Sequence, residues 1–147
     1  METGQRVLVV DDETSIRRYL RAALTAQGLT VYEAADGQEA LNAVLAHRPD
    51  LIILDLGLPD IDGIEVTRRL REWSQTPIII LSVREAEQDK IAALDAGADD
   101  YLTKPISPKV LITKVNALFR RLHKQEDTGI IKIGDLSIDR EKFIVRF

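Results

Sequence analysis

The chain has 147 residues, 45% of them hydrophobic and 30% charged, so it can bury one ordinary core but not the cores of two full-sized domains. Its 20 basic and 24 acidic residues give a formal net charge of −4, which excludes a strong overall attraction to nucleic acid or to an anionic membrane surface. Cysteine is absent, which excludes disulfides, thiolate metal sites and cysteine nucleophiles.

The amino-terminal stretch is polar up to the first apolar run, residues 7–10. A secretory signal or a membrane span needs a longer apolar region than these four residues provide. We therefore expect a cytoplasmic protein that does not associate with a membrane.

Five short apolar runs predict five strands. Most of them are apolar at every position, not at alternate ones, which is typical of strands covered on both faces of a parallel sheet. In chain order they are residues 7–10, 30–33, 51–54, 78–81 and, more weakly, 101–102.

Stripes of apolar residues at helical spacing lie between these runs. In the first stripe, Thr14 or Ser15 can cap the start of a helix, and Gly28 is placed to end it. In the second, residues 36–39 have the spacing of a capping box, and Leu45 belongs to the face expected to point inward. These patterns predict the first two helices.

Three more helices are predicted after the third strand. One follows a turn at Gly63, and the next ends before Gly97 and is expected to anchor in the core through Ile91 and Leu94. The last begins after Ser107, a capping residue that is followed by a proline suited to a first helical turn.

Strands that alternate with helices in this way predict an α/β fold, because each crossover must return right-handed over a face of the sheet. The expected architecture is a doubly wound five-stranded parallel sheet with five helices. Ligands of such sheets bind at the carboxyl ends of the strands.

The pattern changes after residue 123. Residues 124–129 are polar and predict a linker, and residues 130–147 alternate apolar and polar positions as half-buried strands do. Such a short β extension cannot bury a core of its own. We therefore expect a first domain over 1–123 and the first strands of an incomplete second domain over 130–147. An ordered tail docked on the first domain is the alternative.

Acidic residues follow two of the predicted strands. Asp11 and Asp12 come after the first, and Asp55 comes after the third. Alone, each aspartate after a strand is more often a turn or helix cap. Together they would crowd one pocket at the sheet edge, which is unfavourable unless a cation neutralises them. Hard oxygen ligands of this kind favour Mg²⁺.

A hydroxyl and an ammonium are expected at the same edge. Ser82 ends the fourth strand and Lys104 ends the fifth. A phosphoryl group bound to a carboxylate could use both, because the lysine can pair with its oxygens and the serine can donate a hydrogen bond.

Four sequence motifs occur in a specific order: ValLeuValValAspAspGlu, LeuAspLeuGlyLeuProAspIleAspGly, IleLeuSerVal and AspTyrLeuThrLysPro. Together they resemble the receiver domain of bacterial two-component response regulators, over about residues 6–122. The tail resembles the opening strands of the winged-helix DNA-binding domain of the OmpR/PhoB subfamily.

The resemblance implies that Asp55 accepts a phosphoryl group from a sensor histidine kinase. Asp12, Asp55 and the Gly57 carbonyl would hold Mg²⁺ directly, and Asp11 would act through a bound water. Lys104 would contact the phosphoryl oxygens. The domain would be a phosphoacceptor in a phosphorelay and not an enzyme in the ordinary sense, although it assists its own phosphotransfer and dephosphorylation.

The resemblance also implies a switch and a dimer. Ser82 and Tyr101 would be the switch pair, although an ordinary, partly buried aromatic is the alternative for Tyr101. The Lys104–Pro105 bond would be cis. Phosphorylation would change the surface of the fourth helix, fifth strand and fifth helix, and so favour a homodimer. The dimer-face residues would be Lys90, Asp99, Asp100 and Lys114. DNA binding and transcription control would belong to the missing carboxyl-terminal domain and not to this chain.

Two positions depart from the family pattern. Val83 stands where a small residue is usual, and its branched side chain is expected to narrow the approach to Asp55 and slow phosphoryl exchange. Val110 stands where glutamate is usual, so one interchain ion pair is expected to be lost. Exposed pairs contribute only about 0–1 kcal/mol each, which leaves dimerisation plausible.

Two other functions fit the sequence less well. A phosphoaspartyl hydrolase of the haloacid-dehalogenase type also uses an aspartate nucleophile and Mg²⁺, but it carries a second acid where this chain has Gly57. A flavodoxin-like cofactor carrier needs a glycine-rich first loop, whereas the loop here is acidic and would repel a phosphate.

Overall fold

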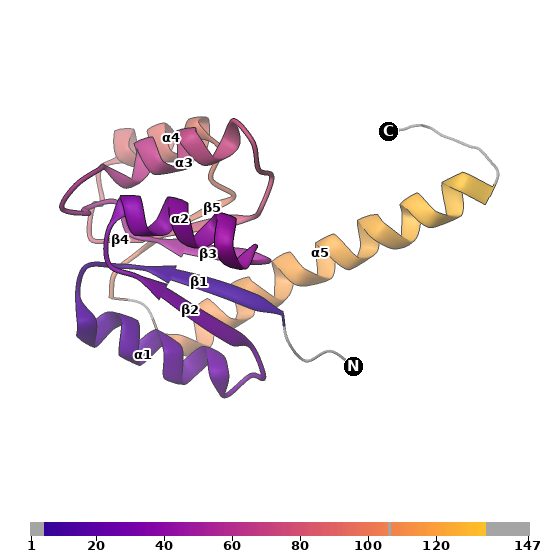
Figure 1. The fold of residues 1–147 in the computed structure, drawn as a ribbon, viewed down its shortest axis with the longest axis horizontal. Helices are drawn as coiled ribbons and strands as arrows, with labels where there is room; N and C mark the ends of the chain where they lie inside the picture. Colours follow the sequence, from indigo (N-terminus) through magenta and orange to yellow (C-terminus); the bar gives the residue numbers. More distant parts are fainter. Residues whose placement is uncertain (1–4, 106, 135–147) are drawn as a thin grey trace. The chain divides into compact units, whose positions relative to one another are not determined.

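The computed structural model describes residues 5–105 and 107–134 of the chain (Figure 1). Within them, five parallel strands form one sheet in the order β2-β1-β3-β4-β5. The strands are β1 (Arg6–Val10), β2 (Thr30–Ala34), β3 (Leu51–Leu54), β4 (Ile78–Ser82) and β5 (Asp100–Thr103). The helices are α1 (Thr14–Thr25), α2 (Gly37–His47), α3 (Gly63–Arg71), α4 (Glu87–Ala96) and α5 (Pro108–Gly134). This confirms the predicted doubly wound α/β fold.

The three central strands are buried at almost every position, because helices cover both faces of the sheet. Figure 1 shows α1 on one side of the sheet and α2, α3 and α4 on the other. Burial of each large aliphatic side chain stabilises the fold by about 1.5–3 kcal/mol. The core on the side of α2 to α4 includes Leu8, Val10, Ile52, Leu54, Ile78 and Ile80 from the sheet and Ala40, Val44, Val66, Leu70 and Ala93 from the helices.

Two of the predicted helix caps are confirmed. The Asp36 side chain accepts a hydrogen bond of 2.8 Å from the Glu39 N–H at the start of α2. The Ser107 hydroxyl accepts one of 3.1 Å from the Val110 N–H at the start of α5. At the start of α1 the prediction of Thr14 or Ser15 was wrong, because the N-cap is Glu13.

Three side chains that were expected to point inward are exposed. Leu45 is 63% exposed, because the buried face of α2 runs through Ala40 and Val44. Ile91 and Leu94 are 52% and 46% exposed, and Ala93 is the only buried residue of α4. A small residue at the contact lets this helix lie close to its neighbours while the larger side chains beside it face outward.

The backbone after residue 123 also differs from the prediction. Helix α5 continues to Gly134, through the stretch where the sequence indicated a linker over 124–129 and a strand from 130. Lysine, glutamine and glutamate are good helix formers, and this stretch contains no proline to stop the helix. Residues 135–147 lie outside the described residues, so the division into domains stays a prediction. In the described ranges, no helix is both long enough and apolar enough to cross a membrane.

Candidate functional site

The three predicted carboxylates lie together at the carboxyl ends of two neighbouring strands. Val10 and Leu54, the last residues of β1 and β3, are partners in the sheet register, and the Asp55 N–H donates to the Val10 carbonyl at 3.0 Å. One carboxylate oxygen from each of Asp11, Asp12 and Asp55 lies within 4.8 Å of the other two. Asp11 and Asp55 are buried, whereas Asp12 is exposed. The register of the two strands is therefore what brings these side chains together.

Lys104 reaches the carboxylates from the end of β5. Its ammonium nitrogen lies 2.7 Å from Asp11 Oδ2 and 3.9 Å from Asp55 Oδ1. The Lys104 N–H donates to the Ser82 carbonyl at 2.7 Å, which fixes the lysine beside the end of β4. The Lys104–Pro105 bond is cis, as expected. One ammonium beside three carboxylates leaves the cluster with a formal excess of negative charge.

Burial is the main influence on the titration of Asp55. It raises the pKa of this carboxyl above its ordinary value, while the nearby Lys104 ammonium lowers it and Asp11 raises it further. The Gly57 N–H also donates to this carboxylate. A bound dication would favour the ionised form, since it would supply the positive charge that one lysine does not.

Asp11 has a further structural role at the start of α1. Its Oδ1 accepts a hydrogen bond of 2.9 Å from the Glu13 N–H. This carboxylate therefore uses one oxygen for the turn and the other for Lys104. No side-chain cap is made by Glu13 itself.

The proposed switch residues lie on β4 and β5. Ser82 is buried at the end of β4, and Tyr101 is partly buried in β5. The Tyr101 hydroxyl donates to the Arg84 carbonyl at 2.8 Å. Burial raises the pKa of Tyr101 above its ordinary value. Val83, which lies between Ser82 and Arg84 in the sequence, is 69% exposed. Its effect on the access of a phosphoryl donor to Asp55 stays a prediction.

The predicted dimer-face residues occupy different environments. Asp99 binds within the chain, because its Oδ2 accepts from Arg71 at 3.1 Å and from the Ile78 N–H at 2.8 Å. Lys90 lies on α4 and Asp100 begins β5. Lys114 lies on α5, which from Leu111 on belongs to a separate compact unit. The contacts of Asp99 tie the end of α3 to the starts of β4 and β5.

We predict that Asp99→Asn lowers the free energy of unfolding by about 1 kcal/mol, because Arg71 is largely buried and would lose its carboxylate partner. Burial already lowers the pKa of Arg71, and Asp99 opposes this effect. Urea denaturation of Asp99→Asn beside the parent chain measures the difference. Equal stability of the variant and the parent would show that the Arg71 contact contributes nothing.

No sequence pattern predicted a role for Arg84, whose contacts join the site to its surroundings. Its guanidinium bonds Asp62, 22 residues earlier, at 2.9 Å. Asp60, in the same loop as Asp62, accepts from the first two N–H groups of α2 at 2.7 and 2.9 Å. Charged residues in loops have no periodic pattern that would predict such pairs.

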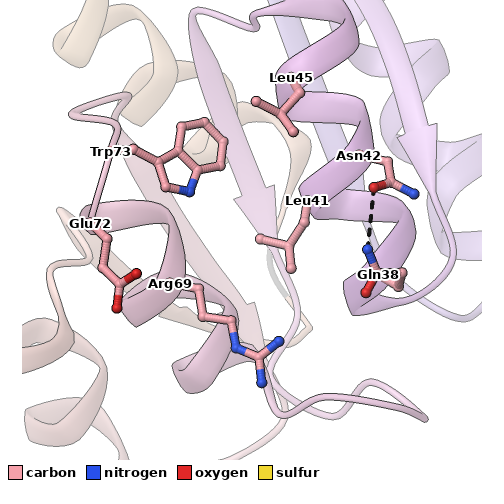
Figure 2. A pocket seen from close by; sticks show the side chains of 7 residues that line it. All are labelled: Gln38, Leu41, Asn42, Leu45, Arg69, Glu72 and Trp73. Atoms are coloured by element: carbon pink, nitrogen blue, oxygen red, sulfur yellow. Dashed lines mark hydrogen bonds between the residues drawn. The ribbon is translucent and has the colours of Figure 1, made fainter.

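An open pocket of about 520 Å³ lies between α2 and α3 (Figure 2). Trp73 and the leucines of α2 form its apolar walls, and the side chains of Gln38 and Asn42 hydrogen-bond to each other at 3.2 Å. No residue of the carboxylate cluster lines this pocket, so the two features are separate. The lining residues are Gln38, Leu41, Asn42, Leu45, Arg69, Glu72 and Trp73.

Comparison with known proteins places the chain in one family. The family model described as the response regulator receiver domain matches residues 7–116. The chain is 50% identical over 135 residues to the KDP operon transcriptional regulatory protein KdpE of Escherichia coli, covering 90% of this chain and 60% of that protein. It is 41% identical over 140 residues to the response regulator ArlR of Staphylococcus aureus, covering 95% of this chain and 63% of that protein.

A solved structure supports the same assignment. A two-component response regulator from Clostridium difficile matches with a TM-score of 0.79 and 30% identity, over 80% of this chain and 98% of that one. The chain spans about three fifths of the length of the two curated relatives. None of these matches supports the haloacid-dehalogenase alternative. The chain belongs to the response regulator receiver domain family of two-component systems.

Proposed function

We propose that this receiver domain accepts a phosphoryl group on Asp55, with Mg²⁺ held by the carboxylate cluster. The observation that carries the proposal is the meeting of three carboxylates within 4.8 Å beside a lysine that contacts two of them. A sensor histidine kinase is the proposed donor. The exposed Asp12 leaves the cluster open to solvent on one side.

The donor atoms at the cluster suit Mg²⁺. All three side chains offer hard carboxylate oxygens, and a small dication with several retained waters needs only one or two of them directly. Asp12, Asp55 and the Gly57 carbonyl would hold the ion, with Asp11 acting through water because it is already bonded to Lys104. When bound, Mg²⁺ would supply positive charge to the phosphoryl oxygens.

The residues of the chain have distinct parts in the proposed transfer. An Asp55 carboxylate oxygen attacks phosphorus while the bond from phosphorus to the histidine nitrogen of the donor breaks, which gives an acyl phosphate and a free imidazole. The Lys104 ammonium would pair with a phosphoryl oxygen, and the Ser82 hydroxyl would donate to another. The acyl phosphate carries about −1.5 to −2 charge in place of the single negative charge of the Asp55 carboxylate, and this change can draw Ser82 inward and reorient Tyr101.

We also propose the output of the switch. The relative KdpE is named as a transcriptional regulatory protein, and the relative ArlR is named as a response regulator. For this chain, phosphorylation would favour a homodimer through Lys90, Asp100 and Lys114, and Asp99 is a weaker candidate because it binds Arg71. Control of transcription would require a DNA-binding domain beyond the receiver.

We expect phosphoryl uptake to depend on Mg²⁺. Incubation of the chain with acetyl phosphate should add the mass of one phosphoryl group when Mg²⁺ is present and none when EDTA removes it. Asp12→Asn should lower the apparent Mg²⁺ affinity at least about ten-fold, because a charged ligand is lost, whereas Asp36→Asn, which alters only a helix cap, should not. Uptake in EDTA would contradict the proposal.

A further inference from the structure

Arg84 contacts both residues of the proposed switch pair through its main chain. Its N–H donates to the Ser82 hydroxyl oxygen at 3.2 Å, and its carbonyl oxygen accepts from the Tyr101 hydroxyl at 2.8 Å. Ser82 and Tyr101 are therefore both tied to the position of one segment, the loop between β4 and α4.

The side chain of Arg84 holds this loop from two directions. One guanidinium nitrogen donates to Asp62 Oδ2 at 2.9 Å, and another lies 3.9 Å from Asp89 Oδ1. Asp62 ends the loop between β3 and α3, and Asp89 lies in the first turn of α4. The hydrogen bond to Asp62 is the largest cause of the raised pKa of Arg84. A guanidinium presents its donors in a fixed fork, which an ammonium does not.

Asp62 is itself held in place. As the N-cap of α3, its Oδ1 accepts a hydrogen bond of 2.8 Å from the Ile64 N–H, so each carboxylate oxygen has a defined partner. Asp60, in the same loop, accepts from the first two residues of α2 at 2.7 and 2.9 Å. The loop is thus anchored to two helices and can support the guanidinium.

We propose that Arg84 is a positioning residue of the phosphorylation switch. Its ion pairs hold the loop so that its N–H donates to the Ser82 oxygen and its carbonyl accepts from the Tyr101 hydroxyl. Because the Ser82 oxygen acts as the acceptor here, its hydroxyl proton is left to donate to another group. A displacement of Ser82 by a phosphoryl group then reaches Tyr101 through one peptide segment. This inference rests on the proposed function, since it concerns how phosphate on Asp55 is sensed.

The first test needs no phosphate. The chain contains three tyrosines, so 3-fluorotyrosine labelling should give three ¹⁹F signals, with that of Tyr101 assigned by Tyr101→Phe. Arg84→Ala and Asp62→Asn should each shift or broaden the Tyr101 signal and leave the other two in place. Asp62→Asn removes the charge but keeps an acceptor for the Ile64 N–H. Arg68→Ala is the control, because Arg68 pairs with Glu65 at 2.6 Å on the exposed side of α3.

The second test adds acetyl phosphate and Mg²⁺. Arg84→Ala and Asp62→Asn should take up the phosphoryl group as the parent does, by intact mass, while the Tyr101 response falls about two-fold or more, the size expected for a partly exposed ion pair. Arg84→Lys, which can keep one contact to Asp62, should restore part of the response. The double variant should lose no more than either single one.

An unchanged Tyr101 signal in both resting variants would overturn the role of Arg84. So would a full Tyr101 response in the phosphorylated variants, or losses that simply add in the double variant. Failure of the parent to take up phosphate would refute the proposed function instead, and the resting-state comparison would still decide whether Arg84 positions Tyr101.

Discussion

Lys104→Met should destabilise the metal-free protein by about 3 kcal/mol and tighten Mg²⁺ binding at least about ten-fold. The Lys104 ammonium lies 2.7 Å from Asp11 and 3.9 Å from Asp55, and both carboxylates are buried. Its removal leaves them without a nearby cation, which is costly in the free protein. The same removal abolishes the repulsion between the ammonium and a bound dication.

Urea denaturation in EDTA and in Mg²⁺, with a Mg²⁺ titration followed by calorimetry, measures both effects. Mg²⁺ should stabilise the variant more than the parent, because it replaces the lost charge. Lys90→Met makes the same change on α4, away from the cluster, and should alter neither quantity. Weaker Mg²⁺ binding by Lys104→Met would show that the lysine does not oppose the ion.

Gly63→Ala should cost about 3 kcal/mol of folding stability, because the added methyl group would meet backbone on two sides. A Cβ at Gly63 would lie 2.5 Å from the Asp55 carbonyl oxygen and 2.7 Å from the Leu56 Cα. The Gly63 N–H also donates to the Leu56 carbonyl at 2.9 Å, so α3 starts directly against the end of β3. Any shift that accommodates the methyl group moves the backbone of Asp55, and Mg²⁺ binding should weaken as well.

Gly28→Ala is the matched control for this variant. Gly28 has a φ of +85°, which an alanine adopts only with strain, but a Cβ there would meet nothing within 4 Å. It should cost about 1 kcal/mol and leave Mg²⁺ binding unchanged. If Gly63→Ala were no less stable than Gly28→Ala, the close approach of α3 to β3 would not be needed for the fold.

Local patterns in the sequence were enough to predict the sheet and the position of the cluster. Apolar runs mark buried strands, and residues that follow parallel strands meet at one edge, so Asp11, Asp12 and Asp55 could be placed together. The capping box at the start of α2 was visible for a similar reason, since its hydrogen bond joins residues three apart.

Features that depend on the packing of distant elements could not be predicted. Ile91 and Leu94 have helical spacing, yet α4 is turned so that only Ala93 is buried, and periodicity does not reveal which face a neighbour covers. The pairs of Arg84 with Asp62 and of Arg71 with Asp99 join residues 22 and 28 positions apart. No local pattern in the sequence distinguishes Asp62 and Asp99 from the other aspartates.

The most direct measurement locates the phosphoryl group itself. After incubation with acetyl phosphate and Mg²⁺, borohydride reduces an acyl phosphate to the corresponding alcohol, which turns a modified aspartate into homoserine. Tandem mass spectrometry of the digested chain should find homoserine at position 55, and Asp55→Asn should yield none. Reduction at Asp11 or Asp12 instead, or an equal yield from Asp55→Asn, would contradict the assignment of Asp55 as the phosphoacceptor.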